Sequence, residues 1–157
     1  MKKLEELLAE HPVFRGLEAE YLHVIAGCAS NVVFQEQEQI FKEGGAADYF
    51  YVIRHGRVAL EVFIPGRGPV NILSIDDGDV LGWSWMFPPY QWHFDARAVD
   101  LTRAAAFDAK CLRDKFESDP KLGYELMKRF AQVMLDRMTI SRLQLLDMYG
   151  KKFPEGE

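Results

Sequence analysis

The spacing of hydrophobic positions changes twice along this chain. Before the His11-Pro12 step, and again from Glu18 to Ala29, apolar side chains recur every three or four positions, which predicts two short amphipathic helices. From Asn31 to Ile75 the period becomes two, in short runs rich in β-branched and aromatic residues, which predicts strands. Helical spacing returns after Asp108. The pattern therefore predicts a mainly β chain with helices at both ends.

Turns rich in glycine, proline and aspartate separate the predicted strands. A further strand pair is expected at 93–99 and 103–108, before the helical spacing returns. Short strands in this order, without helices between them, favour an antiparallel β-roll over alternating β-α units. The expected fold is a jelly roll, or double-stranded β-helix, with N-terminal helices and a long C-terminal helix.

Two helices are expected after the strands. The first runs from Ala109 to Ser118 and ends at the Asp119-Pro120 step, because proline suits the first turn of a following helix. The longer one is expected from Lys121 to Tyr149, with Gly150 as its natural stop. An apolar seam follows this helix at Met127, Phe130, Met134, Met138, Ser141, Leu145 and Met148. A seam this long predicts a homodimer through the helix, and the alternative is packing on the chain's own roll.

The composition narrows the class of protein. The 157 residues suffice for one domain, 1–157, and no internal repeat or linker divides them. No apolar run approaches the roughly 20 residues that span a bilayer. The net charge of −5 argues against a nucleic-acid partner, which would require a basic face. The acidic N-terminus lacks the apolar stretch of an export signal, so we expect a cytoplasmic protein with no disulfide between Cys28 and Cys111.

Four stretches of the chain resemble a known family: residues 14–17 (FRGL), 40–44 (IFKEG), 48–58 (DYFYVIRHGRV) and 73–82 (LSIDDGDVLG). Together they resemble the cyclic nucleotide-binding domain. This is the effector domain of bacterial catabolite-activator-type and fumarate-nitrate-regulator-type proteins, protein kinase A regulatory subunits and gated channels. The resemblance covers roughly residues 10–148 and implies a signal-sensing β-roll. Regulators of this family continue into a DNA-binding helix-turn-helix, which this sequence does not show, so no DNA-binding domain is expected.

The segment from Gly82 to Ala98 departs from that family's phosphate-binding pattern. The resemblance implies a Gly-Glu pair, a short helix, and then Arg followed by Ser or Thr. The Glu binds the ribose, and the Arg and the helix amides hold the cyclic phosphate. An ungapped count from Gly82 puts Trp83 at the Glu position, Trp92 at the Arg position and His93 at the Ser or Thr position. Losing those charge-assisted bonds should cost at least about two to three decades in affinity, so ordinary cyclic AMP binding is not expected.

Three interpretations of this aromatic segment stay open. The indoles fill and close the pocket, or they line an altered pocket for an apolar or planar effector. The third is a genuine receptor for a cyclic or other anionic nucleotide, with a displaced phosphate site at Arg97 or Arg137. The candidate ligand-binding residues are Gly82, Trp83, Ser84, Trp92, His93 and Arg137.

Chemistry beyond binding finds little support. His93 could ligate haem or a metal, but a lone histidine among aromatic residues is typical of a hydrogen-bonded structural position. Ser84, His93 and Asp95 lack the nucleophile-elbow context of a catalytic triad. The two cysteines lack the clustered spacing of an iron–sulfur site. We therefore expect no catalytic residue, metal or cofactor, and a non-enzymatic regulatory module that acts through protein contacts.

Overall fold

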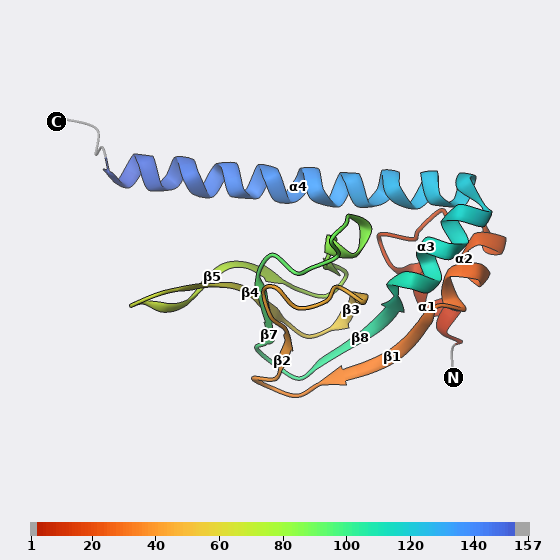
Figure 1. Ribbon diagram of the computed structural model, residues 1–157, viewed down its shortest axis with the longest axis horizontal. Coiled ribbons are helices and arrows are strands. Elements are labelled where there is room, and N and C mark those ends of the chain that lie inside the picture. Colours follow the sequence, from red (N-terminus) through yellow and green to blue (C-terminus); the bar gives the residue numbers. More distant parts are fainter. Residues whose placement is uncertain (1–2, 153–157) are drawn as a thin grey trace.

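Two short helices precede a β-roll, and two further helices follow it (Figure 1). The computed structural model describes residues 3–152. The elements are α1 (Leu4–Glu10), α2 (Ala19–Ala26), β1 (Ala29–Phe34), β2 (Gln39–Phe41), β3 (Tyr49–His55), β4 (Val58–Ile64), β5 (Gly68–Ile75), β6 (Val80–Leu81), the 3-10 turn η1 (Ser84–Met86), β7 (Asp95–Ala98), β8 (Thr102–Asp108), α3 (Ala109–Ser118) and α4 (Pro120–Lys152).

The roll consists of two four-stranded sheets, with strand orders β1-β8-β3-β6 and β2-β7-β4-β5. Strands far apart in sequence are neighbours, since β1 pairs with β8 and β2 pairs with β7, and these pairings are antiparallel. The pairings of β3 with β6 and β8, and of β4 with β5 and β7, are antiparallel too. The predicted antiparallel roll with flanking helices is confirmed.

Stacked aromatic rings fill the interior of the roll. The centroid of the Phe50 ring lies 4.6 Å from that of Phe107, 4.7 Å from that of Trp85 and 5.0 Å from that of Phe130. All four side chains are fully buried. Because they come from β3, β8, η1 and α4, this one cluster ties the long helix to both the roll and the segment that follows β6.

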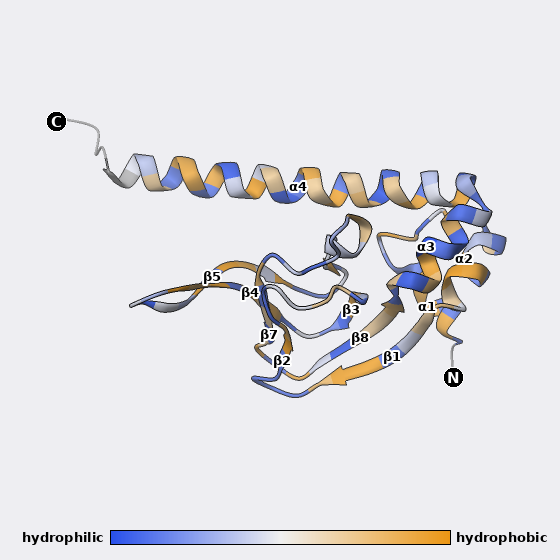
Figure 2. Ribbon diagram, viewed as in Figure 1, coloured by the Kyte–Doolittle hydropathy of each residue, from blue (hydrophilic) through white to orange (hydrophobic). Residues whose placement is uncertain are grey.

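Helix α4 runs the length of the molecule, and its far half lies along the β4–β5 hairpin (Figure 1). Leu122, Leu126 and Phe130 in its first half are buried. Apolar residues continue along the far half (Figure 2), where they are exposed. The expected stop at Gly150 is wrong, because this glycine keeps a helical backbone rather than the left-handed conformation of a helix cap, and α4 continues to Lys152.

The seven positions of the predicted apolar seam lie within about 80° of one another around the helix, at about 100° per residue. Met127, Met138 and Leu145 lie within about 20° of one another on one edge of this stripe, here called the outer face. Phe130 lies about 80° from Met138, on the other edge, and is buried against the roll. As an interface between two copies, the predicted seam is therefore wrong at Phe130, which belongs to the core.

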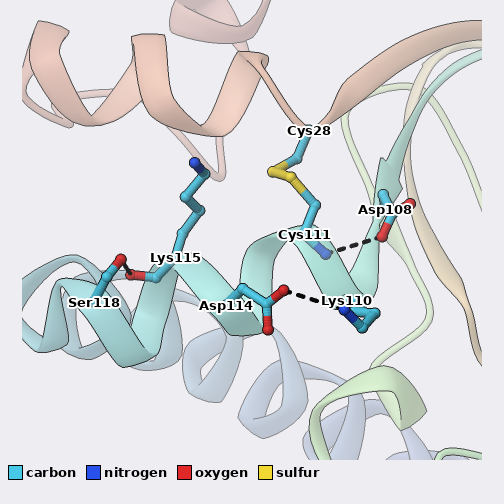
Figure 3. The surroundings of a disulfide bond; sticks show 7 residues. All are labelled: Cys28, Asp108, Lys110, Cys111, Asp114, Lys115 and Ser118. Atoms are coloured by element: carbon cyan, nitrogen blue, oxygen red, sulfur yellow. Dashed lines mark hydrogen bonds and ion pairs between the residues drawn. A yellow bond between two sulfur atoms is a disulfide. The ribbon is translucent and has the colours of Figure 1, made fainter.

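Cys28 and Cys111 form a disulfide (Figure 3), so the expectation that they would not pair is wrong. The sheet explains their proximity. Antiparallel pairing of β1 with β8 places Ala29 opposite Phe107, and the Asp108 amide donates to the Cys28 carbonyl at 2.9 Å. This leaves the two Cα atoms 5.7 Å apart, within the usual disulfide range. The sequence separation of 83 residues concealed a contact that the strand register enforces.

Candidate functional site

The segment from Gly82 to Ala98, here called the aromatic cassette, follows β6 and ends with β7, and its first part rises from the roll toward α4 (green in Figure 1). It starts with the 3-10 turn η1, where the family pattern implies a short helix. Trp85 in this turn is fully buried against Phe50 and Phe130, which fixes the start of the cassette in the core. The remaining candidate residues are positioned around that anchor.

Trp92 lies inside the roll, with 5% of its surface exposed. Its ring stacks on Phe41 of β2, with centroids 3.7 Å apart and an interplanar angle of 8°. The backbone is held as well, because the Trp92 amide donates to the Gly45 carbonyl and the Gly44 amide donates to the Trp92 carbonyl, both at 2.9 Å. Both the ring and the backbone of Trp92 are thus fixed by β2 and the turn after it.

Gly82 accommodates the Trp92 ring. Its φ is +99°, a conformation that side chains rarely adopt. A Cβ atom at this position would lie only 2.7 Å from two ring carbons of Trp92. The absence of a side chain at Gly82 therefore allows the indole to press against the backbone at the start of the cassette.

Trp83 and Arg137 meet at the top of the cassette. The Arg137 guanidinium lies 5.3 Å from the Trp83 ring centroid and donates through Nη2 to the Val80 carbonyl. Its Nη1 is buried and has no hydrogen-bond partner. Burial lowers the pKa of Arg137 to about 10, and the nearby Asp79 carboxylate opposes that shift. The side chain therefore stays cationic at neutral pH, with one buried N–H group unsatisfied.

Ser84 and His93 also contact each other, through Oγ and Nδ1 at 2.9 Å. Ser84 is buried, whereas His93 is exposed. Asp95 does not complete a triad with them, because its Oδ1 accepts from the Glu43 amide at 2.8 Å. The pair is a hydrogen bond across the two arms of the cassette, as expected for a structural histidine.

Arg97 forms an ion pair with Glu61. Its Nε and Nη2 donate to the two carboxylate oxygens of Glu61, each at 2.9 Å, and its Nη1 donates to Gln37. The bond to Arg97 holds the pKa of the buried Glu61 carboxyl below its usual value. Because this fork is fully used, Arg97 offers no free group for an anionic ligand.

Two shallow grooves lie along α4 on either side of Arg137. One, of about 500 Å³, is lined by Trp83, Met134, Arg137, Met138, Ser141, Arg142 and Leu145. The other, of about 350 Å³, lies against β5 and the turn before β6, and Arg129, Asp136 and Arg137 contribute to its wall. Arg137 thus separates an outer, largely apolar groove from a more polar one.

Residues 3–152 contain no cluster of three or more histidine, cysteine or acidic side chains that could hold a metal. Within the same span, no helix has the length and apolar character needed to cross a bilayer.

A family model of the cyclic nucleotide-binding domain matches residues 31–119, which include the whole cassette. The chain belongs to the cyclic nucleotide-binding domain family. A CRP-like cAMP-activated global transcriptional regulator of Mycobacterium tuberculosis is 26% identical to it over 130 residues. That alignment covers 82% of this chain and 58% of the regulator, so the chain spans less than two thirds of this relative.

Solved structures share this domain's fold. A candidate cyclic nucleotide-binding protein of Geobacter metallireducens matches with a TM-score of 0.79 and 28% identity, over 87% of this chain and 99% of that one. The catabolite activator protein of Thermus thermophilus matches with a TM-score of 0.69 and 19% identity, over 88% of this chain and 63% of that one. The second likeness is one of fold alone.

The candidate residues of this cyclic nucleotide-binding domain form three contacts rather than one cluster: Gly82 with Trp92, Trp83 with Arg137, and Ser84 with His93. Sequence reasoning missed Arg113 of α3, whose Nη1 donates to the Trp85 carbonyl at 2.8 Å and whose guanidinium lies 4.1 Å from the Tyr90 ring centroid. It also missed Phe41 as the stacking partner of Trp92. Neither residue stands in a motif, so pattern alone could not have found them.

Proposed function

We propose that this domain is a non-enzymatic regulatory module whose inner pocket is closed by its own cassette and which acts through protein contacts. The family's pocket is where a cyclic nucleotide would bind, and here Trp92 and Phe41 stack within the roll. The observation that carries the proposal is this stacked pair, pressed against a glycine whose missing side chain makes room for the indole. A phosphate entering here would have to displace a buried ring.

The electrostatics support the same conclusion. The family pattern expects a glutamate and an arginine where Trp83 and Trp92 stand, and the nearest arginine on β7 is held in a fork by Glu61. A phosphate must shed water to enter a buried site, and only charged donors offset that cost. Without charged donors, no interaction at this site offsets the cost of desolvating the phosphate, so we expect no tight binding of cyclic AMP or cyclic GMP.

We also propose that two copies associate through the outer face of α4. Met138 is 62% exposed, and Leu145 on the same face is also exposed. Such a face on a soluble helix is typical of an interface, and methionine packs adaptably against a partner. A second copy placed there would cover the groove beside Trp83. The proposed absence of a nucleic-acid partner fits the net charge of −5, and a proposed cytoplasmic location completes the proposal.

Titration calorimetry with cyclic AMP and cyclic GMP tests the closed pocket. We expect no heat of binding at micromolar nucleotide, and dissociation constants of about 1 mM or weaker. A dissociation constant below about 10 μM, equivalent to roughly 7 kcal/mol of binding free energy, would contradict the proposal. A Trp92→Arg variant serves as a matched comparison, since it returns the missing charge to the family position.

A second candidate function is favoured by one observation at Arg137. Its buried Nη1 has no partner, and its guanidinium faces the Trp83 ring beside the outer groove of about 500 Å³. An aromatic anion could stack on Trp83 and satisfy that N–H group after a small shift of the side chain. If wild-type protein binds a nucleotide and Arg137→Gln abolishes the binding while Arg97→Gln retains it, this displaced site replaces the closed-pocket proposal.

A further inference from the structure

The disulfide joins two segments that have different neighbours. Cys28 lies between α2 and β1 and is buried, whereas Cys111 lies in the first turn of α3 and is partly exposed (Figure 3). They are the only two cysteines of the chain. Disulfides of cytoplasmic proteins are usually transient or redox-responsive rather than structural. If the domain is cytoplasmic, as proposed above, this bond therefore has the character of a reversible site.

Helix α3 connects this bond directly to the aromatic cassette. Arg113 lies two residues after Cys111, donates to the Trp85 carbonyl at 2.8 Å and covers the Tyr90 ring at 4.1 Å. Tyr90 itself has a φ of +53°, an unusual value for a residue other than glycine. One side chain of α3 therefore holds both η1 and the turn that leads back toward Trp92.

The same helix also packs tightly against α4. Leu112 is fully buried, and a Cβ atom added to Gly123 of α4 would lie 3.1 Å from Cβ of Phe116. Such close packing passes a small displacement of α3 on to its neighbours, because packed interiors do not deform freely. The disulfide restrains α3 at its first turn. A change in the position of α3 would therefore also shift the cassette and the long helix.

We propose that Cys28 and Cys111 form a reversible thiol–disulfide switch that sets the conformation of the aromatic cassette through Arg113. The reductant is a dithiol. One of its thiolates attacks Sγ of Cys111, which forms a mixed disulfide and releases Cys28 as a thiolate that takes up a proton. The second thiol of the dithiol then breaks the mixed disulfide, leaving Cys111 as a thiol and the dithiol as a disulfide. Two electrons pass from the dithiol to the protein.

The reduced protein should change locally and remain folded. Two hydrogen bonds at this junction do not depend on sulfur: the Cys111 amide donates to Asp108 Oδ1 at 2.9 Å, and the Asp108 amide donates to the Cys28 carbonyl. The β1–β8 ladder also persists without the bond. What reduction removes is the lateral restraint on α3, so the bond from Arg113 to Trp85 is the contact that loosens.

Intrinsic tryptophan fluorescence tests the switch, because all three tryptophans, at 83, 85 and 92, lie in the cassette. Wild-type protein is equilibrated with mixtures of reduced and oxidised dithiothreitol, and its thiols are counted by maleimide trapping. We expect tryptophan emission to change in step with the appearance of two thiols, while far-UV circular dichroism stays constant. Thiols that appear without a change in emission, or a bond that never forms under oxidising conditions, would overturn the proposal.

Two variants separate the switch from simple stabilisation. Arg113→Lys keeps the charge but loses the planar fork, so the bond should still titrate while the emission response falls severalfold. Lys110→Gln, on the same turn as Cys111 and paired with exposed Asp114, should respond like wild type. If Arg113→Lys responds fully, the route through Arg113 is wrong.

Hydrogen exchange covers the case in which reduction weakens the fold. Reduced and oxidised wild-type proteins are compared amide by amide. We expect exchange in residues 84–92 to accelerate roughly tenfold on reduction, while the amides of β1 and β8 remain protected, because local opening is separable from global unfolding. An equal acceleration in all segments would mean that the disulfide only stabilises the fold, and would overturn the switch.

Discussion

The aromatic cassette and the far half of α4, residues 138–150, both contain many large apolar side chains. These side chains are largely buried in the cassette and exposed on the helix. In the cassette, Trp85 and Trp92 are buried among rings from β2, β3 and α4. Along the far half of α4, Met138, Leu145 and Met148 are exposed. The difference indicates that the cassette's apolar surface stabilises this chain, whereas that of the helix is available to a partner.

The largest effect is expected where the cassette enters the roll. Trp92→Ala removes a buried indole and its stack on Phe41, so the free energy of unfolding should fall by about 3–5 kcal/mol. Urea unfolding followed by far-UV circular dichroism measures this. Phe87→Ala, in the same segment but 48% exposed, is the control and should cost below about 1 kcal/mol. Equal, small losses in the two variants would show that Trp92 lines an open site rather than filling it.

Lowering the pH should reduce the free energy of unfolding through the buried side chain of His11. Burial lowers the pKa of His11 to about 4, and its Nδ1 accepts from the Val13 amide, which requires a neutral ring. The unfolded chain takes up this proton near pH 6.5 and the folded chain does so only near pH 4, so stability falls as the pH drops between these values. From pH 7 to pH 4.5 the loss from His11 should be about 2 kcal/mol.

Comparison with a variant isolates this histidine from other groups. His11→Gln should flatten the pH dependence of the unfolding free energy above pH 4.5. His23→Gln is the comparison at an exposed histidine, whose side chain is 78% exposed and whose Nδ1 lies 2.7 Å from Glu5 Oε1. The same slope in wild type and His11→Gln would contradict the prediction, because it would mean that His11 takes up its proton at the same pH in the folded and the unfolded chain.

The smallest effect on stability is expected on the far half of α4, where association should change instead. Met138→Glu should alter the free energy of unfolding by no more than about 0.5 kcal/mol, because the side chain is exposed. It should nevertheless abolish a dimer, since a two-fold interface brings both copies of the new charge into a desolvated surface. Sedimentation velocity at micromolar concentration compares wild type with the variant.

Leu143→Glu is a matched control for that experiment. Leu143 is 60% exposed, close to the 62% of Met138, but it lies about 140° around the helix. It should therefore leave the dimer intact. A wild type that sediments as a monomer would contradict dimerisation and would leave the outer face for a different protein.

The sequence predicted the fold well because its signals are local. The change from helical to alternating spacing near Asn31 and the Asp119-Pro120 step mark boundaries that the structure confirms. The predictions that failed concern contacts between distant positions. The Cys28–Cys111 bond depends on the β1–β8 register, and the burial of Phe130 depends on how α4 settles on the roll. The Gly150 stop failed for another reason, since a glycine permits a helix end without requiring one.

The ligand-binding residues named from the sequence stay a prediction, and the contacts between them could not be derived from the sequence. Counting from Gly82 identified Trp83, Trp92 and His93 as the residues that replace the family's polar groups, and all three lie in the cassette. Their separation into three contacts could not be derived, because it depends on partners from other elements. Phe41 of β2 supplies the ring that stacks on Trp92, and Val80 of β6 supplies the carbonyl that accepts from Arg137. Glu61 of β4 holds Arg97 in a fork, and Arg113 of α3 donates to the Trp85 carbonyl.

A pair of hydrogen bonds near the start of the chain has a consequence for the order of folding. Arg129 of α4 donates through Nη1 to the carbonyls of Val13 and Arg15, at 2.8 and 2.9 Å, across sequence separations of 116 and 114 residues. Closing so long a loop is entropically costly, so we expect these contacts to form after the roll has brought the two segments together. During synthesis the carbonyls of Val13 and Arg15 emerge early, and Arg129 can reach them only after α4 has left the ribosome. The link between the turn after α1 and the long helix should therefore be among the last contacts to form.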